Sequence, residues 1–207
     1  ALATALEKSG VKHVVALSSI GADKTEGNGP VAGLYVLEQK LNRVPGLSVL
    51  HLRAGYFMEN MLAQIGVIRS MGMLAGPLRP DLKLPMIATR DIGAFAALAL
   101  HKLDFSGHST RELLGQRDLT MAEVAQIIGP AIGKPGLSYS KVPDLMLKPA
   151  LTSMGMSSDV AGRILEMSAA LNSGHMRALE PRSAANTTPT SFETWVKEVF
   201  VPAFEKK

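Results

Sequence analysis

The sequence contains no cysteine among its 207 residues. Disulfides, thiolate catalysis and cysteine-ligated metal sites are therefore excluded. The five histidines show no helical ligand spacing such as HxxxH, so the sequence predicts no structural metal. Long apolar runs are missing as well. The segment GAFAALAL (93–100) is far shorter than the ~18 residues of a membrane-spanning helix.

Aromatic residues and excess charge are also scarce. Aromatics make up 5% of the chain, and 22 basic against 18 acidic residues leave a net charge of +4 with the basic residues scattered. A nucleic-acid reader would need a basic stripe interleaved with aromatics. The content of 46% hydrophobic and 19% charged residues is typical of soluble globular proteins. With no basic-then-apolar signal at the start, we expect a cytoplasmic protein with no nucleic-acid or membrane partner.

Apolar strands alternate with amphipathic helices along the chain, which predicts an α/β fold with a parallel sheet wound with helices. The strands VKHVVALSS and LSVLHLRAG are apolar on both faces, as in a sheet covered by helices on each side. Predicted strands cover 11–19, 47–55, 111–115 and 137–143, with a short apolar segment at 85–88. Predicted helices cover 1–10, 31–44, 58–72, 91–103, 120–133, 143–154, 158–172 and 191–204.

Polar residues mark several helix starts. We expect Asp91 to cap the helix that follows it. Thr120 with Glu123, and Thr190 with Glu193, each have the spacing of a capping box. Residues after about 116 are rich in helix, so we expect a smaller helical lobe over 117–207, interleaved with the sheet-forming part at 1–116.

The sequence predicts fewer strands than a complete doubly wound sheet has, and it lacks the glycine-rich loop of such a sheet. Such a sheet usually has about five or more strands, and a glycine-rich phosphate loop follows its first strand. Only about three central strands are predicted here, and neither GxGxxG nor GxxGxxG occurs. We therefore expect the C-terminal portion of a Rossmann-like sheet with a small helical lobe. Because the strand at 11–19 has the pattern of an internal strand, these residues alone should associate, as a homo-oligomer or through an exposed sheet edge.

Four segments in this order carry a family resemblance. They are GVKHVVALSSIGA, LEQKLNRVPGLSVLHLRAGYFMEN, LPMIATRDIGAFAALAL and LTMAEVAQIIGPAIGKPGLSY. Together they resemble the NmrA-like branch of the atypical short-chain dehydrogenases, from residue 1 to roughly 200. The resemblance implies that the glycine-rich NAD(P) loop and about four strands would precede Ala1. It implies NAD or NADP as cofactor, bound only when that region is supplied, and no metal.

The resemblance also implies where the cofactor would lie. Ligands of open α/β sheets sit beyond the carboxyl ends of the strands. Ser18 and Ser19 occupy such an end, before a polar loop that is free to close over a ligand; they could instead satisfy backbone groups there. The second expected wall is RAGYFMEN, where Gly55 would permit close approach. The cofactor-binding residues predicted from this turn are Gly55, Tyr56, Phe57, Met58 and Asn60. An ordinary helix start is the alternative.

The residues predicted to line the substrate site are Tyr35, Met86 and Ile87. For Met86 and Ile87, core packing is the alternative. Short-chain dehydrogenases typically use Tyr-x-x-x-Lys, but Gln39 stands four residues after Tyr35 and the nearest lysine is Lys40. Five residues place the two side chains ~140° apart around a helix, so they cannot form the usual couple. NmrA-like proteins often lack this motif, and no catalytic residue is assigned.

The resemblance implies an NAD(P)-binding oxidoreductase with a small-molecule substrate, to which it passes a hydride; the expected acceptor is quinone-like or a carbonyl compound. Such transfer depends more on positioning than on a side-chain acid. Two alternatives stay open: a non-catalytic redox sensor that binds NAD(P), and a truncated remnant that binds no dinucleotide.

Overall fold

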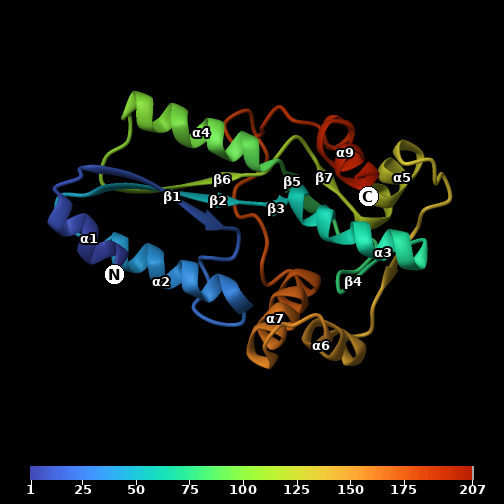
Figure 1. Cartoon of the computed structure of the whole chain (residues 1–207). Helices are drawn as coiled ribbons and strands as arrows, with labels where there is room; N and C mark the ends of the chain where they lie inside the picture. The colour runs from blue at the N-terminus through green and yellow to red at the C-terminus, as the bar shows by residue number, and fades with distance from the viewer. Residues whose placement is uncertain (207) are drawn as a thin grey trace.

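Three parallel strands form the centre of the computed structural model, which describes residues 1–206 (Figure 1). They are β1 (His13–Ser19), β2 (Ser48–Ala54) and β6 (His108–Leu113), in the order β1-β2-β6. Helices α1 (Leu2–Ser9) and α2 (Ala32–Leu41) cover one face, and α4 (Thr89–Lys102) covers the other. Side chains alternate across the sheet as the strand period requires: Val49 packs toward α1 and α2, whereas Leu50 packs toward α4. The predicted α/β class is confirmed.

A helical lobe follows the sheet and shares a core with segments before residue 116. Phe192, Trp195 and Phe200 are fully buried there against Met58 and Met86. The other helices are η1 (Gly29–Val31), η2 (Met58–Ala63), α3 (Gln64–Met71), α5 (Met121–Ala131), α6 (Asp144–Ser153), α7 (Ser158–Ser173), α8 (Phe192–Trp195), η3 (Val196–Phe200) and α9 (Val201–Glu205). The short strands are β3 (Tyr56–Phe57), β4 (Leu74–Gly76), β5 (Leu84–Ile87), β7 (Asp118–Leu119) and β8 (Tyr139–Lys141). The division of the chain at residue 116 stays a prediction.

Two of the three predicted caps are wrong. The capping box of Thr120 and Glu123 is present at α5. Helix α4, however, begins at Thr89, so Asp91 lies inside its first turn. The last helix is capped by Ser191, whose hydroxyl accepts from the backbone N–H of Thr194. Asp91 and Thr190 instead bind each other across the fold, because a long-range partner outcompeted the local one.

The loop after β1 is packed rather than free to close over a ligand. Ala22 and Asn28 are fully buried. The Asn28 amide donates to the carbonyls of Gly21 (3.1 Å) and Lys24 (3.0 Å), which closes the loop on itself. Met176, just after α7, lies directly against Gly21. The expectation of a mobile cover was wrong, since polar composition concealed these buried contacts.

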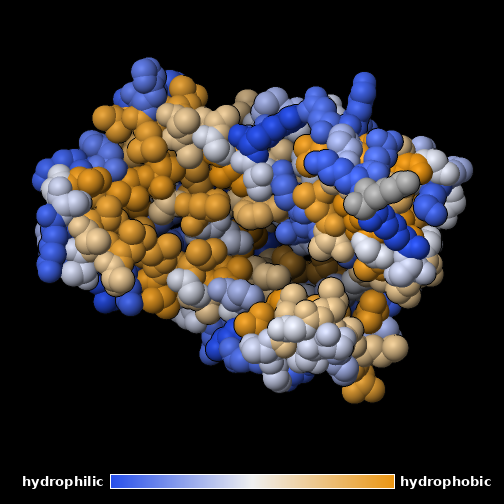
Figure 2. All heavy atoms as spheres, viewed as in Figure 1, coloured by the Kyte–Doolittle hydropathy of each residue, from blue (hydrophilic) through white to orange (hydrophobic). Residues whose placement is uncertain are grey.

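Strand β1 has a partner on one side only among residues 1–206. Leu17 on this strand is 49% exposed. Figure 2 shows apolar side chains gathered over this end of the molecule, between α4 and the α1–α2 pair. The exposed large apolar residues of these elements and their flanks are Leu2, Val11, Leu17, Val36, Leu98, Leu100 and Leu103. An apolar strand edge of this kind is a template for association, which stays a prediction.

A buried histidine on β2 should make stability depend on pH. His51 is 2% exposed, and its Nε2 lies 2.8 Å from Asn42 Oδ1. Burial lowers the pKa of His51 below its ordinary 6.5; Arg53 and His108 act in the same direction, while Glu38 opposes them. The folded state therefore binds fewer protons than the unfolded state as the pH falls through 6.5. Stability should be full above that pH and decline below it.

The variant His51→Gln should lose this dependence. Urea unfolding at mildly alkaline and mildly acidic pH gives the loss for each protein. We expect the parent to lose more stability on acidification than His51→Gln, whereas His101→Gln, at an exposed position on α4, should behave like the parent. Equal losses in the parent and His51→Gln would show that His51 does not carry the effect.

Candidate functional site

A cavity of about 510 Å³ lies beyond the carboxyl ends of β1 and β2, between the sheet and the helical lobe. Figure 2 shows the surface hollowed above the α6–α7 pair. The volume falls within the range of small-molecule sites. Its lining residues are Ser19, Ile20, Ala54, Gly55, Tyr56, Phe57, Asn60, Leu82, Lys83, Leu84, Pro85, Leu114, Asp118, Met167, Leu171, Gly174, Met176, Arg177, Ala178, Glu180 and Arg182.

The two serines at the end of β1 face different surroundings. Ser19 lines the cavity and donates its hydroxyl proton to the carbonyl of Ile20 at 2.9 Å, which leaves its oxygen able to accept. Ser18 is buried and donates to Glu38 Oε1 at 2.6 Å. Successive side chains of a strand point to opposite faces, so only one of the pair reaches the cavity.

Ser18 belongs to a buried ion-pair cluster between α2 and β2. Arg53 donates from its Nε to Glu38 Oε1 at 3.0 Å and from a terminal nitrogen to Oε2 at 2.6 Å. The side chains of Arg53 and Glu38 are 15% and 4% exposed. This bidentate contact raises the pKa of Arg53 against the opposing effect of burial. The cluster fixes α2 to the carboxyl end of the sheet.

The turn after β2 supplies a second wall of the cavity; that it binds the cofactor stays a prediction. Gly55, Tyr56, Phe57 and Asn60 line the cavity, whereas Met58 is buried in the core of the helical lobe. Burial raises the pKa of the Tyr56 phenol, although its hydrogen bond with Asn60 opposes the shift. An ordinary phenol is already protonated at neutral pH, so this shift leaves the Tyr56 phenol in its neutral form.

The backbone at Gly55 lies close to another strand of the protein. A β-carbon at this position would lie 2.3 Å from the carbonyl oxygen of Pro85, on the neighbouring strand β5. The absence of a side chain is thus required by strand packing. A role of Gly55 toward the cofactor stays a prediction.

The residues predicted to line the substrate site do not line this cavity. Met86 and Ile87 are fully buried in two separate cores, which is the packing alternative. Tyr35, on α2, is not among the cavity residues. The cavity wall is completed instead by the end of α7 and the segment after it, including Met167, Leu171, Met176 and Arg177. No local pattern marks these residues, because they meet β1 and β2 only in the tertiary structure.

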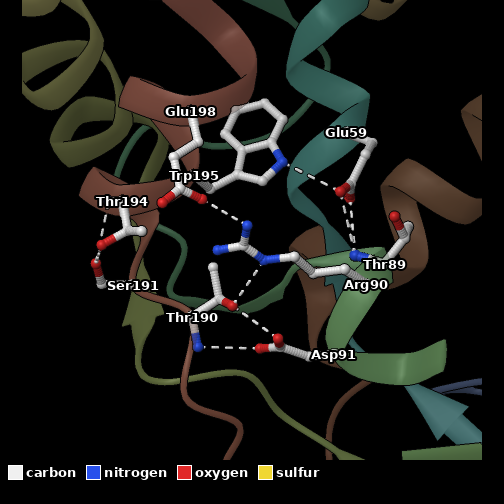
Figure 3. A network of polar contacts seen from close by, with 9 residues as sticks. All are labelled: Glu59, Thr89, Arg90, Asp91, Thr190, Ser191, Thr194, Trp195 and Glu198. Carbon is white, nitrogen blue, oxygen red and sulfur yellow. Dashed lines mark hydrogen bonds and ion pairs between the residues drawn. The ribbon is translucent and has the colours of Figure 1, made fainter. Parts of the chain in front are cut away.

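A polar network joins the turn to the start of α4 and the C-terminal helices (Figure 3). Glu59 accepts from the backbone N–H of Thr89 with both oxygens, at 3.2 and 3.1 Å, and from Trp195 Nε1 at 3.1 Å. Glu59 thereby caps a helix start that has no cap from its own sequence. Asp91 accepts from the backbone N–H and the hydroxyl of Thr190, at 3.0 and 2.7 Å.

Removing the Glu59 carboxylate should loosen this junction. The change Glu59→Ala leaves the indole N–H of the fully buried Trp195 and a helix N–H without their acceptor, at a cost of about 1–3 kcal/mol. Because Trp195 is the only tryptophan, its fluorescence should change in the folded state as well. Urea unfolding followed by fluorescence measures both effects.

The control is Glu166→Ala on α7, where the carboxylate lies 4.0 Å from Arg163 at a half-exposed surface position. This change should leave the folded-state spectrum intact and cost little. A Glu59→Ala protein as stable as Glu166→Ala would contradict the role assigned to Glu59.

Among residues 1–206, no group of three or more histidine, aspartate or glutamate side chains could hold a metal ion. None of the described helices combines the length and apolar character needed to cross a membrane.

Some known proteins are similar to this chain in sequence, and others are similar in fold. An NAD(P)H azoreductase of Xenophilus azovorans is 34% identical over 171 residues, which cover 81% of this chain and 57% of the relative. The chain thus spans little more than half the length of that protein. A quinone oxidoreductase of Escherichia coli, QOR2, solved with NADPH, superposes with a TM-score of 0.70 at 21% identity, covering 96% of this chain and 69% of the other.

A triphenylmethane reductase of a Citrobacter species, solved with NADP(H), gives a TM-score of 0.72 at 18% identity, covering 93% of this chain and 67% of the other. At such identities these structures support the fold alone. The match to a family is more extensive, since the NmrA-like family is matched over residues 1–196. This chain belongs to the NmrA-like family.

Proposed function

We propose that the chain forms the acceptor side of an NAD(P)H-dependent oxidoreductase that reduces a small quinone-like or carbonyl compound. The observation that carries the proposal is the apolar cavity at the carboxyl ends of β1 and β2, which is where open α/β sheets bind ligands. The azoreductase name of the Xenophilus azovorans relative and the NADPH bound to the Escherichia coli quinone oxidoreductase support it.

The residues present fit one end of a dinucleotide. Ser19 has a free acceptor on its hydroxyl, and Tyr56 with Phe57 provides a flat apolar wall beside it. These residues would hold the nicotinamide end, whereas the sequence contains no glycine-rich loop for the pyrophosphate. When bound, the reduced nicotinamide supplies a hydride. The cavity contributes by excluding water and aligning the acceptor.

Steady-state reduction of quinones, aldehydes and azo dyes tests the proposal. It should be measured on this chain and on the product of the complete reading frame that contains it, with NADH and NADPH. The variant Ala178→Trp places an indole in the cavity, while Ala131→Trp adds the same group at an exposed position on α5. We expect Ala178→Trp to lower kcat/KM by roughly tenfold or more, a loss of ~1.4 kcal/mol in transition-state binding, and Ala131→Trp to have little effect.

A sensor that binds NAD(P) without turnover is the alternative, favoured by one observation. Tyr35 lies outside the cavity, and the lysine of the usual couple is missing. Cofactor binding without reduction of any acceptor would support the sensor and reject the reductase.

Tyr35→Phe provides a further prediction for the reductase. Since this phenol does not line the cavity, its removal should leave turnover within roughly threefold of the parent, whereas loss of a general acid costs about 10²–10⁴-fold. A hundredfold fall in kcat at unchanged KM would mean that Tyr35 takes part in the chemistry.

A further inference from the structure

The charged residues of the cavity are unevenly paired. Arg182 forms an ion pair with Asp118 and donates to the carbonyl of Leu114 at 3.2 Å. Glu180 accepts from the backbone N–H of Glu112 at 3.3 Å and lies 4.0 Å from Arg111. Hydrogen-bond or ion-pair partners within the protein are therefore present for Arg182, Asp118 and Glu180.

The two remaining cations have no such partner. Among residues 1–206, no carboxylate lies within 4.0 Å of Lys83 or Arg177, and neither side chain makes a hydrogen bond to protein. Glu123 is held by the Thr120 capping box, whose hydrogen bonds lower the pKa of that carboxyl, and the charge of Lys83 adds only a smaller effect in the same direction. Lys83 precedes β5 and Arg177 follows α7, so two separate segments bring these cations to one cavity.

The rest of the lining is suited to a flat apolar body. Leu82, Leu84, Leu171 and two methionines, Met167 and Met176, form much of the wall. Methionine side chains adapt to ring surfaces and make favourable sulfur–aromatic contacts. An arginine beside such a wall can bind two oxygens of a carboxylate or sulfonate with parallel hydrogen bonds, and a lysine adds a point charge.

We propose that the acceptor is an aromatic compound bearing an anionic group, a sulfonate or carboxylate, with Arg177 and Lys83 binding the anion and the leucine–methionine wall binding the rings. That the bound compound is reduced rests on the proposed function. Its binding at this site can be tested without turnover.

The test compares two dyes that differ only in one substituent, which is charged in one dye and neutral in the other. Methyl orange carries a sulfonate, and the corresponding 4-dimethylaminoazobenzene sulfonamide is neutral with the same ring system. Equilibrium binding to the 207-residue chain is measured by titration calorimetry for the parent, Arg177→Gln, Lys83→Gln and the double variant. Lys134→Gln, an exposed lysine after α5 that does not line the cavity, is the matched control.

We expect the parent to bind the sulfonate roughly tenfold more tightly than the sulfonamide. The double variant should lose that preference, each single variant should lose part of it, and Lys134→Gln should retain it. Equal binding of the two dyes, no binding of either, or a preference that survives in the double variant would overturn the proposal. Because the exposed apolar face near β1 would bind both dyes alike, it cannot produce the charge preference.

A second arm separates the acceptor from the cofactor as the source of the anion. The dye should not be displaced by ADP, which carries the diphosphate of the dinucleotide; displacement by ADP would assign the two cations to the cofactor and overturn the proposal. Turnover then distinguishes the two proposals. A charge preference in binding without reduction of any acceptor would reject the reductase and keep the anion site. Reduction of charged and neutral acceptors with equal kcat/KM would support the reductase and reject the anion site.

Discussion

Replacing Glu38 by alanine is expected to destabilise the protein by about 3–5 kcal/mol. The carboxylate is 4% exposed and is the shared acceptor of the Ser18 hydroxyl and the Arg53 guanidinium. Its removal leaves the guanidinium, itself 15% exposed, without its bidentate partner beneath α2, and only the more distant charges of Asp23 and Glu112 still act on it. An uncompensated buried charge costs more than the lost contact, because the guanidinium was taken out of water to form the pair.

Two comparison variants identify the cause. The double change Glu38→Leu with Arg53→Met removes both charges, and it should recover much of the stability if the unpaired cation is responsible. The change Asp81→Ala breaks an exposed pair with Arg79 and should have little measurable effect. Urea unfolding of the four proteins decides the matter. A double variant as unstable as Glu38→Ala would show that lost packing, rather than unpaired charge, causes the damage.

Replacing Gly55 by valine is expected to cost about 3 kcal/mol or more in stability. The new β-carbon would meet the Pro85 carbonyl oxygen at 2.3 Å, so strand β3 would have to move away from β5. The obstacle is backbone rather than a flexible side chain, which leaves little room for relaxation. A glycine that only admits a ligand would behave differently, losing binding while keeping the thermal midpoint of the parent.

Gly66→Ala is the matched control for this change. Gly66 lies within α3, and an added β-carbon would have no neighbour within 4 Å. Alanine should stabilise that helix by up to ~1 kcal/mol. Gly55→Val with an unchanged unfolding midpoint would overturn the packing explanation and return this glycine to the ligand side.

The sequence by itself determined the order and type of the main elements. Strand β1 and helix α7 lie within two residues of their predicted ranges, because apolar periodicity is a local property that burial then rewards. The Thr120 capping box was predictable for the same reason, since donor and acceptor are three residues apart. The turn at Gly55–Asn60 was likewise found from its place after an apolar strand.

Only the tertiary structure decided which polar groups were already occupied. Ser18 donates its hydroxyl proton to Glu38, and Asp91 accepts from Thr190. Helix α4 is capped by Glu59, which lies thirty residues before Thr89. Lys83 and Arg177 became candidate site residues only when β5 and α7 met at one cavity. The physical reason is that a hydrogen bond or ion pair forms with whichever partner burial brings near, and sequence spacing specifies only the partners within a turn or two of the chain.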